Sequence, residues 1–343
     1  MKEKILICGN YGVGNLGDEA ILRALIQYWG KDYEITAMSA TPEKTKQKFG
    51  IKAVHKYPSG IRSHLRRLIT SKGRKNAKET IKAIRNSDRL ILGGGTLLTD
   101  EPWKSMFVWS AQVKQIEKQG KQIELYANGV GPFQKKWSKR WAKKILTKAK
   151  QISVRDERSA QWVKEIIGES PKIIKDPVLN MVVENKKTTN KERKRVAIFA
   201  LRYWTNNMNE TEKTINKFIQ YLWLEKGVKS IIVPFEVENK KDSMIMNKII
   251  EQLPRNYGAK IWDDYENEMD VINAISHSEL VIGMRLHSLI FANITNTPFI
   301  GISYMEKVRS FGKEIKKEAW IVDLEELSIE KLKDIYETHH ERD

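Results

Sequence analysis

Short apolar runs alternate with segments of helical periodicity along the 343 residues of the chain. This alternation is typical of parallel β-sheets covered by helices. The apolar runs that we expect to form strands lie at residues 4–8, 33–38, 89–92, 122–127, 151–155, 196–201, 230–234, 280–284 and 298–303. The chain is long enough for about two domains. We therefore predict an α/β protein with two Rossmann-like domains facing a cleft, in which ligands bind at the carboxyl ends of strands.

The boundary between the domains is expected in a polar segment near the middle of the chain. Residues 185–195 have no apolar anchor and are mostly charged, a composition typical of linkers. We expect an N-terminal domain at 1–185, a linker at 186–195, a C-terminal domain at 196–327, and a C-terminal helix and tail at 328–343. Helices are expected at residues 18–29, 103–118, 136–148, 210–225, 243–253, 269–276, 286–293 and 329–339.

The net charge of +18 is unevenly distributed. Residues 44–78 contain twelve Lys or Arg and no acid, and residues 135–150 contain eight and no acid. Such regions attract polyanions, which include nucleic acid, anionic lipid and phosphorylated substrates. Residues 135–150 also carry Trp137, Trp141 and Ile145 at helical spacing. This stripe fits a helix that buries its aromatic side chains in a domain core, or one that contacts an anionic membrane surface.

The composition excludes several classes of protein. Cys8 is the only cysteine and lies in an apolar run, so we expect a buried structural thiol and no disulfide. No apolar stretch approaches the roughly 18 residues of a membrane span, and residues 1–9 do not resemble a signal peptide. No His, Asp and Glu cluster has metal-ligand spacing. We therefore expect a cytoplasmic protein without metal or cofactor.

A glycine-rich loop joins the first strand to the first helix. Gly12, Gly14 and Gly17 match the G-x-G-x-x-G pattern of dinucleotide-binding proteins. The second strand lacks the terminal acid that would bind the ribose, and Asp18 at the helix N-terminus would repel a pyrophosphate. These features argue against NAD binding. Two interpretations stay open: a tight turn in which Asp18 caps the helix, and a loop in which Asn15 and Asp18 bind substrate hydroxyls.

Two further strands of the first half end in glycines, at residues 93–95 and 129–131. Gly94 and Gly95 fit either a backbone that approaches an anionic ligand or a crowded contact between strand and helix. Arg155 ends another strand and fits either a ligand contact or an ion pair with Asp156. Together the glycine-rich strand ends favour a shared binding site.

The second half places basic residues at three strand ends. Arg202 follows one strand, where its guanidinium could bind a carboxylate or phosphate. Arg285 and His287 join the next strand to a helix, whose N-terminus favours an anion. Lys307 follows the last strand and could complete this site, although its spacing alone fits a surface lysine.

The segments at residues 12–22, 93–100, 129–132, 153–159, 176–179, 283–292 and 301–308 together resemble the polysaccharide pyruvyl transferases, most closely the CsaB type. This resemblance implies a glycosyltransferase-B-like fold, phosphoenolpyruvate as donor and a pyruvate ketal on a sugar as product. For the CsaB type it also implies a lipid-linked, N-acetylmannosamine-containing acceptor, a precursor of secondary cell wall polysaccharide whose ketals anchor S-layer proteins.

The resemblance also implies roles for matching residues. Arg202, Arg285, Leu286, His287 and Lys307 are expected around phosphoenolpyruvate, with His287, Arg202 and Lys307 catalytic. One departure is Tyr304, because the family often has Asp-Pro before this lysine. The strand ends of the first half, rather than the resemblance, predict the acceptor-binding residues: Asn15, Gly17, Asp18, Gly94, Gly95 and Arg155.

Location and partners follow from the acceptor. A lipid-linked sugar lies at the membrane, so we expect the enzyme to be peripheral at the inner face, where its basic regions could dock. The alternative function is a nucleotide-sugar-dependent glycosyltransferase of the same fold. Nucleic-acid binding would explain the charge, but the sequence has no recognised motif for it.

Overall fold

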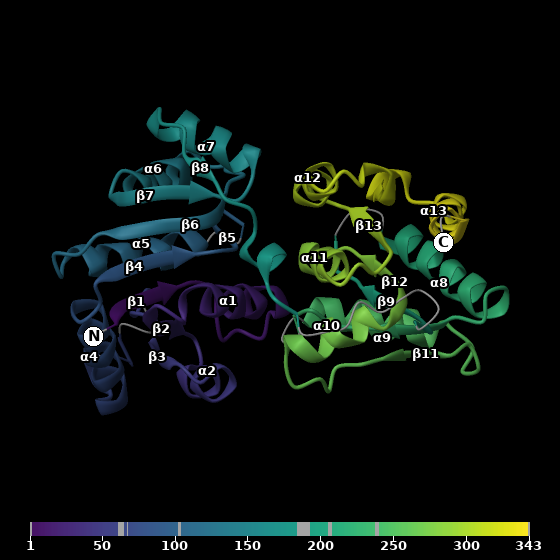
Figure 1. Ribbon diagram of the computed structural model, residues 1–343, viewed down its shortest axis with the longest axis horizontal. Coiled ribbons are helices and arrows are strands. Elements are labelled where there is room, and N and C mark those ends of the chain that lie inside the picture. Colours follow the sequence, from purple (N-terminus) through teal and green to yellow (C-terminus); the bar gives the residue numbers. More distant parts are fainter. Residues whose placement is uncertain are drawn as a thin grey trace. The chain divides into compact units, whose positions relative to one another are not determined.

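The computed structural model describes residues 2–60, 65–66, 68–101, 104–183, 193–204, 208–236 and 240–341 (Figure 1). The chain forms two compact units. The first contains residues 1–13 and 18–182, and the second contains residues 14–17 and 183–343. The short segment 14–17 therefore belongs to the second unit, although the rest of the first glycine-rich loop belongs to the first.

The first unit is built on a parallel sheet with the strand order β3-β2-β1-β4-β6-β7-β8, and β5 pairs with β6. The strands are β1 (Glu3–Cys8), β2 (Tyr33–Ser39), β3 (Lys52–His55), β4 (Arg89–Gly93), β5 (Thr96–Leu98), β6 (Ile123–Val130), β7 (Ala149–Val154) and β8 (Lys172–Ile173). The helices are α1 (Leu16–Trp29), α2 (Pro42–Phe49), α4 (Ser71–Arg85), α5 (Ser105–Glu117), α6 (Lys136–Leu146) and α7 (Glu157–Ile167).

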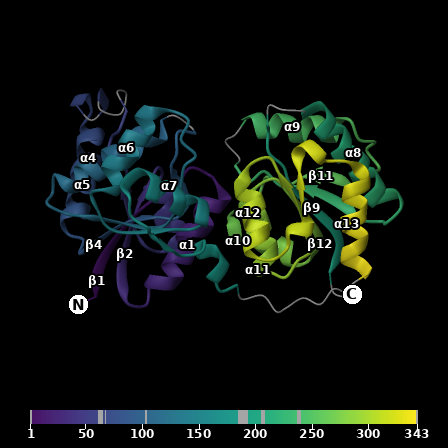
Figure 2. The same cartoon turned by 90° about the horizontal axis from the view of Figure 1, so that it is seen from above.

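Alternation along the central strands fills both faces of this sheet. Leu6 and Leu90 point into a core that contains Ile84 of α4, Val113 of α5 and side chains of α6 and α7. The buried residues Ile5, Ile7 and Ile91 alternate with them, and α1 lies on their face (Figure 2). A continuous apolar run on each strand is therefore what this sheet needs.

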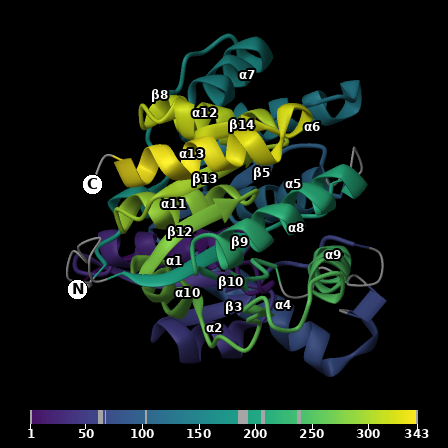
Figure 3. The same ribbon diagram turned by 90° about the vertical axis from the view of Figure 1, so that its right-hand side faces the viewer.

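The second unit contains a parallel sheet with the order β11-β10-β9-β12-β13-β14. Its strands are β9 (Lys194–Ala200), β10 (Lys229–Ile232), β11 (Ala259–Ile261), β12 (Ser278–Gly283), β13 (Phe299–Ser303) and β14 (Ile321–Asp323). Its α-helices are α8 (Met208–Leu224), α9 (Lys240–Glu251), α10 (Glu268–Ser276), α11 (Leu286–Ile294), α12 (Glu306–Glu314) and α13 (Ile329–Glu341). Helices α8, α9 and α13 pack on one face, and α10, α11 and α12 contact the sheet as well (Figure 3).

The predicted α/β class with parallel sheets in two domains is confirmed. Most of the predicted linker, residues 186–192, lies outside the described residues. Strand β9 begins at Lys194, within the segment interpreted as linker. Arg193 holds the start of β9 in place, because its Nη1 donates to the Ser278 carbonyl at 3.0 Å and to Thr297 Oγ1 at 2.9 Å. The predicted domain bounds otherwise stay predictions.

Two side-chain interpretations are settled in the first unit. Burial raises the pKa of Cys8 to about 12, so its thiol stays protonated. Trp137 and Trp141 of α6 pack against Phe107, with ring centroids 5.4 and 5.2 Å apart, and Ile145 is buried. The aromatic stripe of α6 therefore faces the domain core. In the part of the chain that the structure describes, no helix is long and apolar enough to cross a membrane.

Candidate functional site

The first glycine-rich loop is held by the side chains that follow it. Asp18 accepts a hydrogen bond from Asn10 Nδ2 at 3.0 Å, and Glu19 accepts one from the Gly12 N–H at 2.7 Å. The Oδ1 of Asn15 accepts from the Gly17 N–H at 3.0 Å. Helix α1 begins at Leu16, two residues before its predicted start. The polar side chains expected to meet a ligand thus also shape the loop.

Gly94 and Gly95 lie at a crowded contact between β4 and α1. Both have positive φ, and a Cβ at Gly94 would stand 2.2 Å from Ile21 Cγ2. A Cβ at Gly95 would stand 3.2 Å from Asp18 Oδ1, so these two predicted acceptor residues are neighbours. Strand-to-helix packing accounts for Gly94, and the close approach of Asp18 accounts for Gly95.

Arg155 is 8% exposed, and its guanidinium is engaged within the first unit. Its Nε donates to Asp156 Oδ2 at 3.1 Å, and its Nη2 donates to Thr96 Oγ1 at 2.9 Å. Burial acts to raise the pKa of Asp156, but the charge of Arg155 and hydrogen bonds from Ser159 outweigh it and lower that pKa. The ion pair considered from the sequence is present, next to Gly95.

In the second unit, Arg202 lies just beyond the end of β9 and Tyr304 just beyond the end of β13. Arg202 Nη1 donates to the Tyr304 hydroxyl at 2.9 Å. Lys307 Nζ lies 5.5 Å from the centroid of the Tyr304 ring, and the Trp204 ring packs 4.8 Å away. Two residues predicted to bind the donor therefore meet at a tyrosine.

The surroundings of Tyr304 lower the pKa of its hydroxyl. Burial acts to raise its pKa, but the charges of Lys307 and Arg202, with a hydrogen bond from Lys307, outweigh burial. The net effect lowers the pKa of Tyr304 below its usual value near 10. Tyr304 is therefore more acidic than an ordinary tyrosine.

Arg285 forms a buried ion-pair network that the sequence did not suggest. It is 8% exposed, and its Nη2 donates to Glu236 Oε2 at 3.0 Å and to Asp242. Asp242 is 1% exposed and also accepts the Tyr203 N–H at 2.9 Å. Two carboxylates thus offset the charge of Arg285. Its Nε is buried and has no hydrogen-bond acceptor among the described residues.

His287 lies in the first turn of α11, directly after Arg285 and Leu286. A Cβ on Gly17 would stand 2.2 Å from His287 Nδ1, so glycine is needed for the imidazole to keep this position. The Leu16 N–H donates to the Phe235 carbonyl at 3.0 Å, and Asn15 forms a β-bridge with Glu236. Segment 14–17 is therefore bound next to Arg285 and His287.

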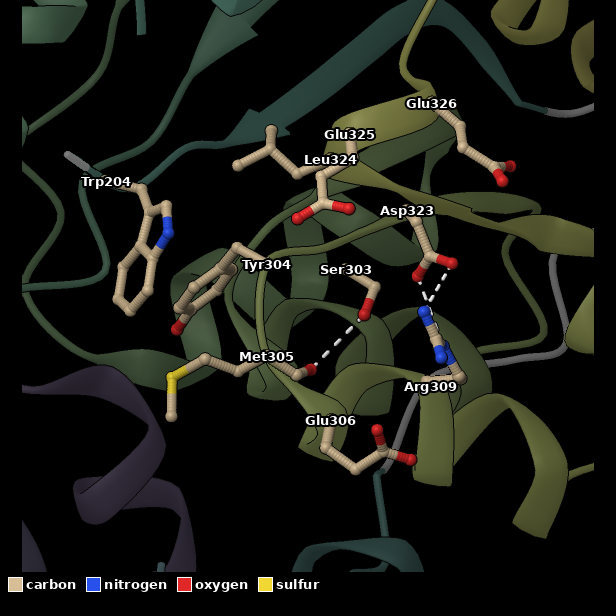
Figure 4. A pocket seen from close by; sticks show the side chains of 10 residues that line it. All are labelled: Trp204, Ser303, Tyr304, Met305, Glu306, Arg309, Asp323, Leu324, Glu325 and Glu326. Atoms are coloured by element: carbon tan, nitrogen blue, oxygen red, sulfur yellow. Dashed lines mark hydrogen bonds and ion pairs between the residues drawn. The ribbon is translucent and has the colours of Figure 1, made fainter. Parts of the chain in front are cut away.

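A pocket of about 300 Å³ in the second unit is lined in part by Trp204 and Tyr304 (Figure 4). Its other lining residues include Arg309, which is paired with Asp323, and three further acidic residues, Glu306, Glu325 and Glu326. Acidic side chains outnumber basic ones in this lining. The pocket is consequently a poor place for a phosphate, in contrast to the basic surroundings of the Tyr304 hydroxyl.

Solved structures share this fold at low sequence identity. Anabaena Alr3699/HepE in complex with UDP-glucose is 12% identical, with a TM-score of 0.62 over 98% of this chain and 89% of that chain. S. aureus MnaA with UDP is 13% identical, with a TM-score of 0.62 over 99% and 87%. E. coli ADP-heptose LPS heptosyltransferase II is 12% identical, with a TM-score of 0.52 over 99% and 100%. The fold is thus glycosyltransferase-B-like, as predicted.

Comparison of the sequence with protein-family models shows the family of this chain. The family model described as polysaccharide pyruvyl transferase matches residues 15–306. The chain therefore belongs to the polysaccharide pyruvyl transferase family, and it is an enzyme that transfers pyruvate onto polysaccharide. No curated protein matches the chain.

Three residues of the candidate site, Tyr304, Glu236 and Asp242, were not predicted from the sequence. Tyr304 was noted only as a departure from the family pattern, although its place after β13 put it among the strand ends. Glu236 and Asp242 lie 49 and 43 residues before Arg285, and no spacing rule connects them. A polar residue at a strand end was the only available signal.

Proposed function

We propose that this enzyme transfers the pyruvyl group of phosphoenolpyruvate onto a sugar as a cyclic ketal and releases phosphate. The observation that carries the proposal is the hydrogen bond from Arg202 to Tyr304, with Lys307 at the same ring. Phosphoenolpyruvate carries one carboxylate charge and about two phosphate charges. Two cations at one place suit that load.

Arg202 and Lys307 bind the anionic groups of the donor in this proposal. Arg285 contributes one N–H, from the buried Nε that has no acceptor among the described residues. Its two carboxylate partners fix the plane of the guanidinium, so that this N–H keeps one direction. The backbone N–H of Leu286, in the first turn of α11, adds a donor at a helix N-terminus.

His287 and Tyr304 carry the protons. His287 protonates the methylene carbon of phosphoenolpyruvate, while the Tyr304 phenolate takes the proton of the first sugar hydroxyl, whose oxygen bonds to the adjacent carbon. That carbon then loses phosphate as the second hydroxyl attacks and closes the ring. Tyr304 returns its proton to the departing phosphate, and His287 takes the proton of the second hydroxyl. Both side chains end in their starting states, and such acid–base help is typically worth about 10²–10⁴ in rate.

The acceptor in this proposal is a lipid-linked precursor of secondary cell wall polysaccharide that contains N-acetylmannosamine. Its ketal would anchor S-layer proteins. Asn15 and Asp18 hydrogen-bond its hydroxyls, while Gly17, Gly94 and Gly95 allow close approach of the sugar. Arg155 holds Thr96 beside Gly95 and so acts on the acceptor through the loop. The enzyme works in the cytoplasm as a peripheral protein at the inner face of the membrane.

Thermal shift distinguishes this proposal from a nucleotide-sugar-dependent glycosyltransferase. Phosphoenolpyruvate should raise the Tm of the wild type and leave that of Arg202→Ala nearly unchanged, because ligand binding stabilises the folded state. If UDP- or GDP-sugars raised the Tm and phosphoenolpyruvate did not, the alternative function would replace the proposed one.

A further inference from the structure

Three aliphatic side chains are exposed close together in the first unit. Leu65, Leu68 and Ile69 are 48%, 62% and 73% exposed. The other large apolar side chains that are exposed among the described residues stand singly in the sequence: Tyr28, Ile173, Val182, Leu224 and Met244. Single exposed apolar residues are ordinary, whereas a cluster marks an interaction surface.

Local hydrogen bonds order this segment. Thr70 is the N-cap of α4, and its Oγ1 accepts the Gly73 N–H at 3.0 Å. Its N–H and its hydroxyl both donate to the Arg66 carbonyl, at 3.0 and 2.8 Å. Arg74 Nη1 donates to the Leu68 carbonyl at 2.8 Å. The exposed aliphatic residues are therefore presented by a short helical turn that directly precedes the capped start of α4.

The charge around this turn has one sign. Arg66, Lys72, Arg74 and Lys75 are exposed, and residues 44–78 contain no acid. Aliphatic side chains surrounded by lysine and arginine complement a bilayer with acyl chains beneath anionic headgroups. Nucleic acid would bind the lysine and arginine side chains but would gain little from exposed leucine and isoleucine. Proteins bind single-stranded nucleic acid mainly through stacking of its bases on aromatic rings.

Helix α6, the other basic segment, has no comparable cluster of exposed aliphatic side chains. Trp137 and Trp141 pack on Phe107 within the first unit. Its lysines can contribute attraction to an anionic surface, but its two tryptophans are partly buried against the domain core, so they offer less apolar surface than Leu68 and Ile69. The turn before α4 is therefore the better candidate.

We propose that the turn of Leu65, Arg66, Leu68 and Ile69, with the basic first turns of α4, docks the enzyme on an anionic lipid bilayer. The aliphatic side chains enter the acyl region and the basic side chains contact the headgroups. The biological purpose of this docking rests on the proposed function, because a lipid-linked acceptor lies in that membrane. The binding itself does not depend on pyruvyl transfer.

Vesicle co-sedimentation of the full chain tests this surface. The wild type should bind to vesicles of phosphatidylglycerol mixed with phosphatidylcholine. It should bind much less to vesicles of phosphatidylcholine alone. The double variant Leu68→Asp/Ile69→Asp should lower the partition coefficient about tenfold or more. Met244→Asp, at a side chain that is 69% exposed in the second unit, is the matched control and should bind as wild type does.

Two outcomes would overturn the proposal. One is wild-type binding that does not depend on lipid charge, and the other is equal binding by the double variant. A gel shift with single-stranded DNA that is tight, salt-sensitive and unchanged in the double variant, without vesicle binding, would assign the basic region to nucleic acid instead.

The activity assay separates this proposal from the proposed function. With a short, soluble acceptor, phosphate release from phosphoenolpyruvate should be the same in wild type and in Leu68→Asp/Ile69→Asp. Vesicle binding without any phosphate release would contradict the proposed function and leave the docking surface in place. Phosphate release without vesicle binding would contradict the docking surface alone.

Discussion

Arg202 and Tyr304 are 102 residues apart in sequence, and the Nη1 of the arginine donates to the hydroxyl of the tyrosine at 2.9 Å. The strands that precede them, β9 and β13, both pair with β12 in one parallel sheet, so their carboxyl ends lie at the same edge. This edge of an α/β sheet is where ligands bind. The pair therefore joins a predicted donor-binding cation to the tyrosine that we propose as an acid–base group.

Replacing Tyr304 by phenylalanine should remove the proposed base. We expect kcat to fall about 10²-fold or more, with a smaller change in the KM for phosphoenolpyruvate, because Arg202 and Lys307 remain. The proposed reaction needs the Tyr304 phenolate and a protonated His287, so the wild-type rate should rise with pH on the acid side, as the phenolate forms, and fall on the alkaline side, as His287 loses its proton. The lowered pKa of Tyr304 increases the fraction of enzyme in which both states occur together. Tyr304→Phe should lose the rise on the acid side.

The pH profile of kcat/KM for both proteins measures this effect. Tyr203→Phe is the matched control, because it removes the hydroxyl of another tyrosine, directly after Arg202 in the sequence. A Tyr304→Phe profile that keeps the wild-type shape would show that another group is the base.

Replacing Arg202 by lysine keeps the charge but loses the planar fork of the guanidinium. We expect the Kd for phosphoenolpyruvate to rise about tenfold, which is about 1.4 kcal/mol. Isothermal titration calorimetry gives this value directly. An unchanged Kd would mean that Arg202 does not contact the donor.

Arg285→Ala should act on stability before it acts on catalysis. It would leave the Asp242 carboxylate buried without its cation, and breaking a buried pair costs about 3–5 kcal/mol. The double variant Arg285→Ala/Asp242→Asn should recover much of the lost stability, because asparagine removes the charge and still accepts the Tyr203 N–H. Urea unfolding of both variants measures the difference.

Recovery of stability without recovery of activity is the expected pattern for this pair. It would show that Arg285 also serves the reaction, through its Nε. Full recovery of activity in the double variant would restrict Arg285 to a structural role.

Gly17→Ala should displace His287. The new Cβ would stand 2.2 Å from Nδ1, a contact closer than any real Cβ makes, so the imidazole must move. We expect kcat to fall about tenfold or more, since catalytic groups tolerate little misplacement. Circular dichroism should show a folded protein, because Gly17 lies in the first turn of α1, where alanine is a good helix former. Wild-type kcat in Gly17→Ala would argue against His287 as the proton donor.

The strands that are buried on both faces were predictable from the sequence, because their apolar runs are continuous. It did not indicate the elements with little burial. Both residues of β8, Lys172 and Ile173, are exposed, so no pattern marked this strand. Helix α4 buries mainly Ala77, Thr80 and Ile84, and its many lysines obscured the periodicity.

The positions of Arg202, Arg285 and Lys307 close after strand ends were predictable, because each follows an apolar run in the sequence. The partners of these residues were not, because tertiary contacts bring them from distant segments. The ion pair of Arg285 with Asp242 and the contact of Gly17 with His287 are examples. A basic side chain that is predicted to bind a ligand can instead form an ion pair with a carboxylate of the protein, and the structure is needed to see that pair.

The most direct test of the proposed reaction is the release of inorganic phosphate from phosphoenolpyruvate, with and without a synthetic lipid-diphosphate disaccharide that ends in N-acetylmannosamine. We predict release that depends on the acceptor, with a matching gain of one pyruvate ketal on the sugar by mass spectrometry. Phosphate release without the ketal, or no reaction with this or any other saccharide acceptor, would contradict the proposed function.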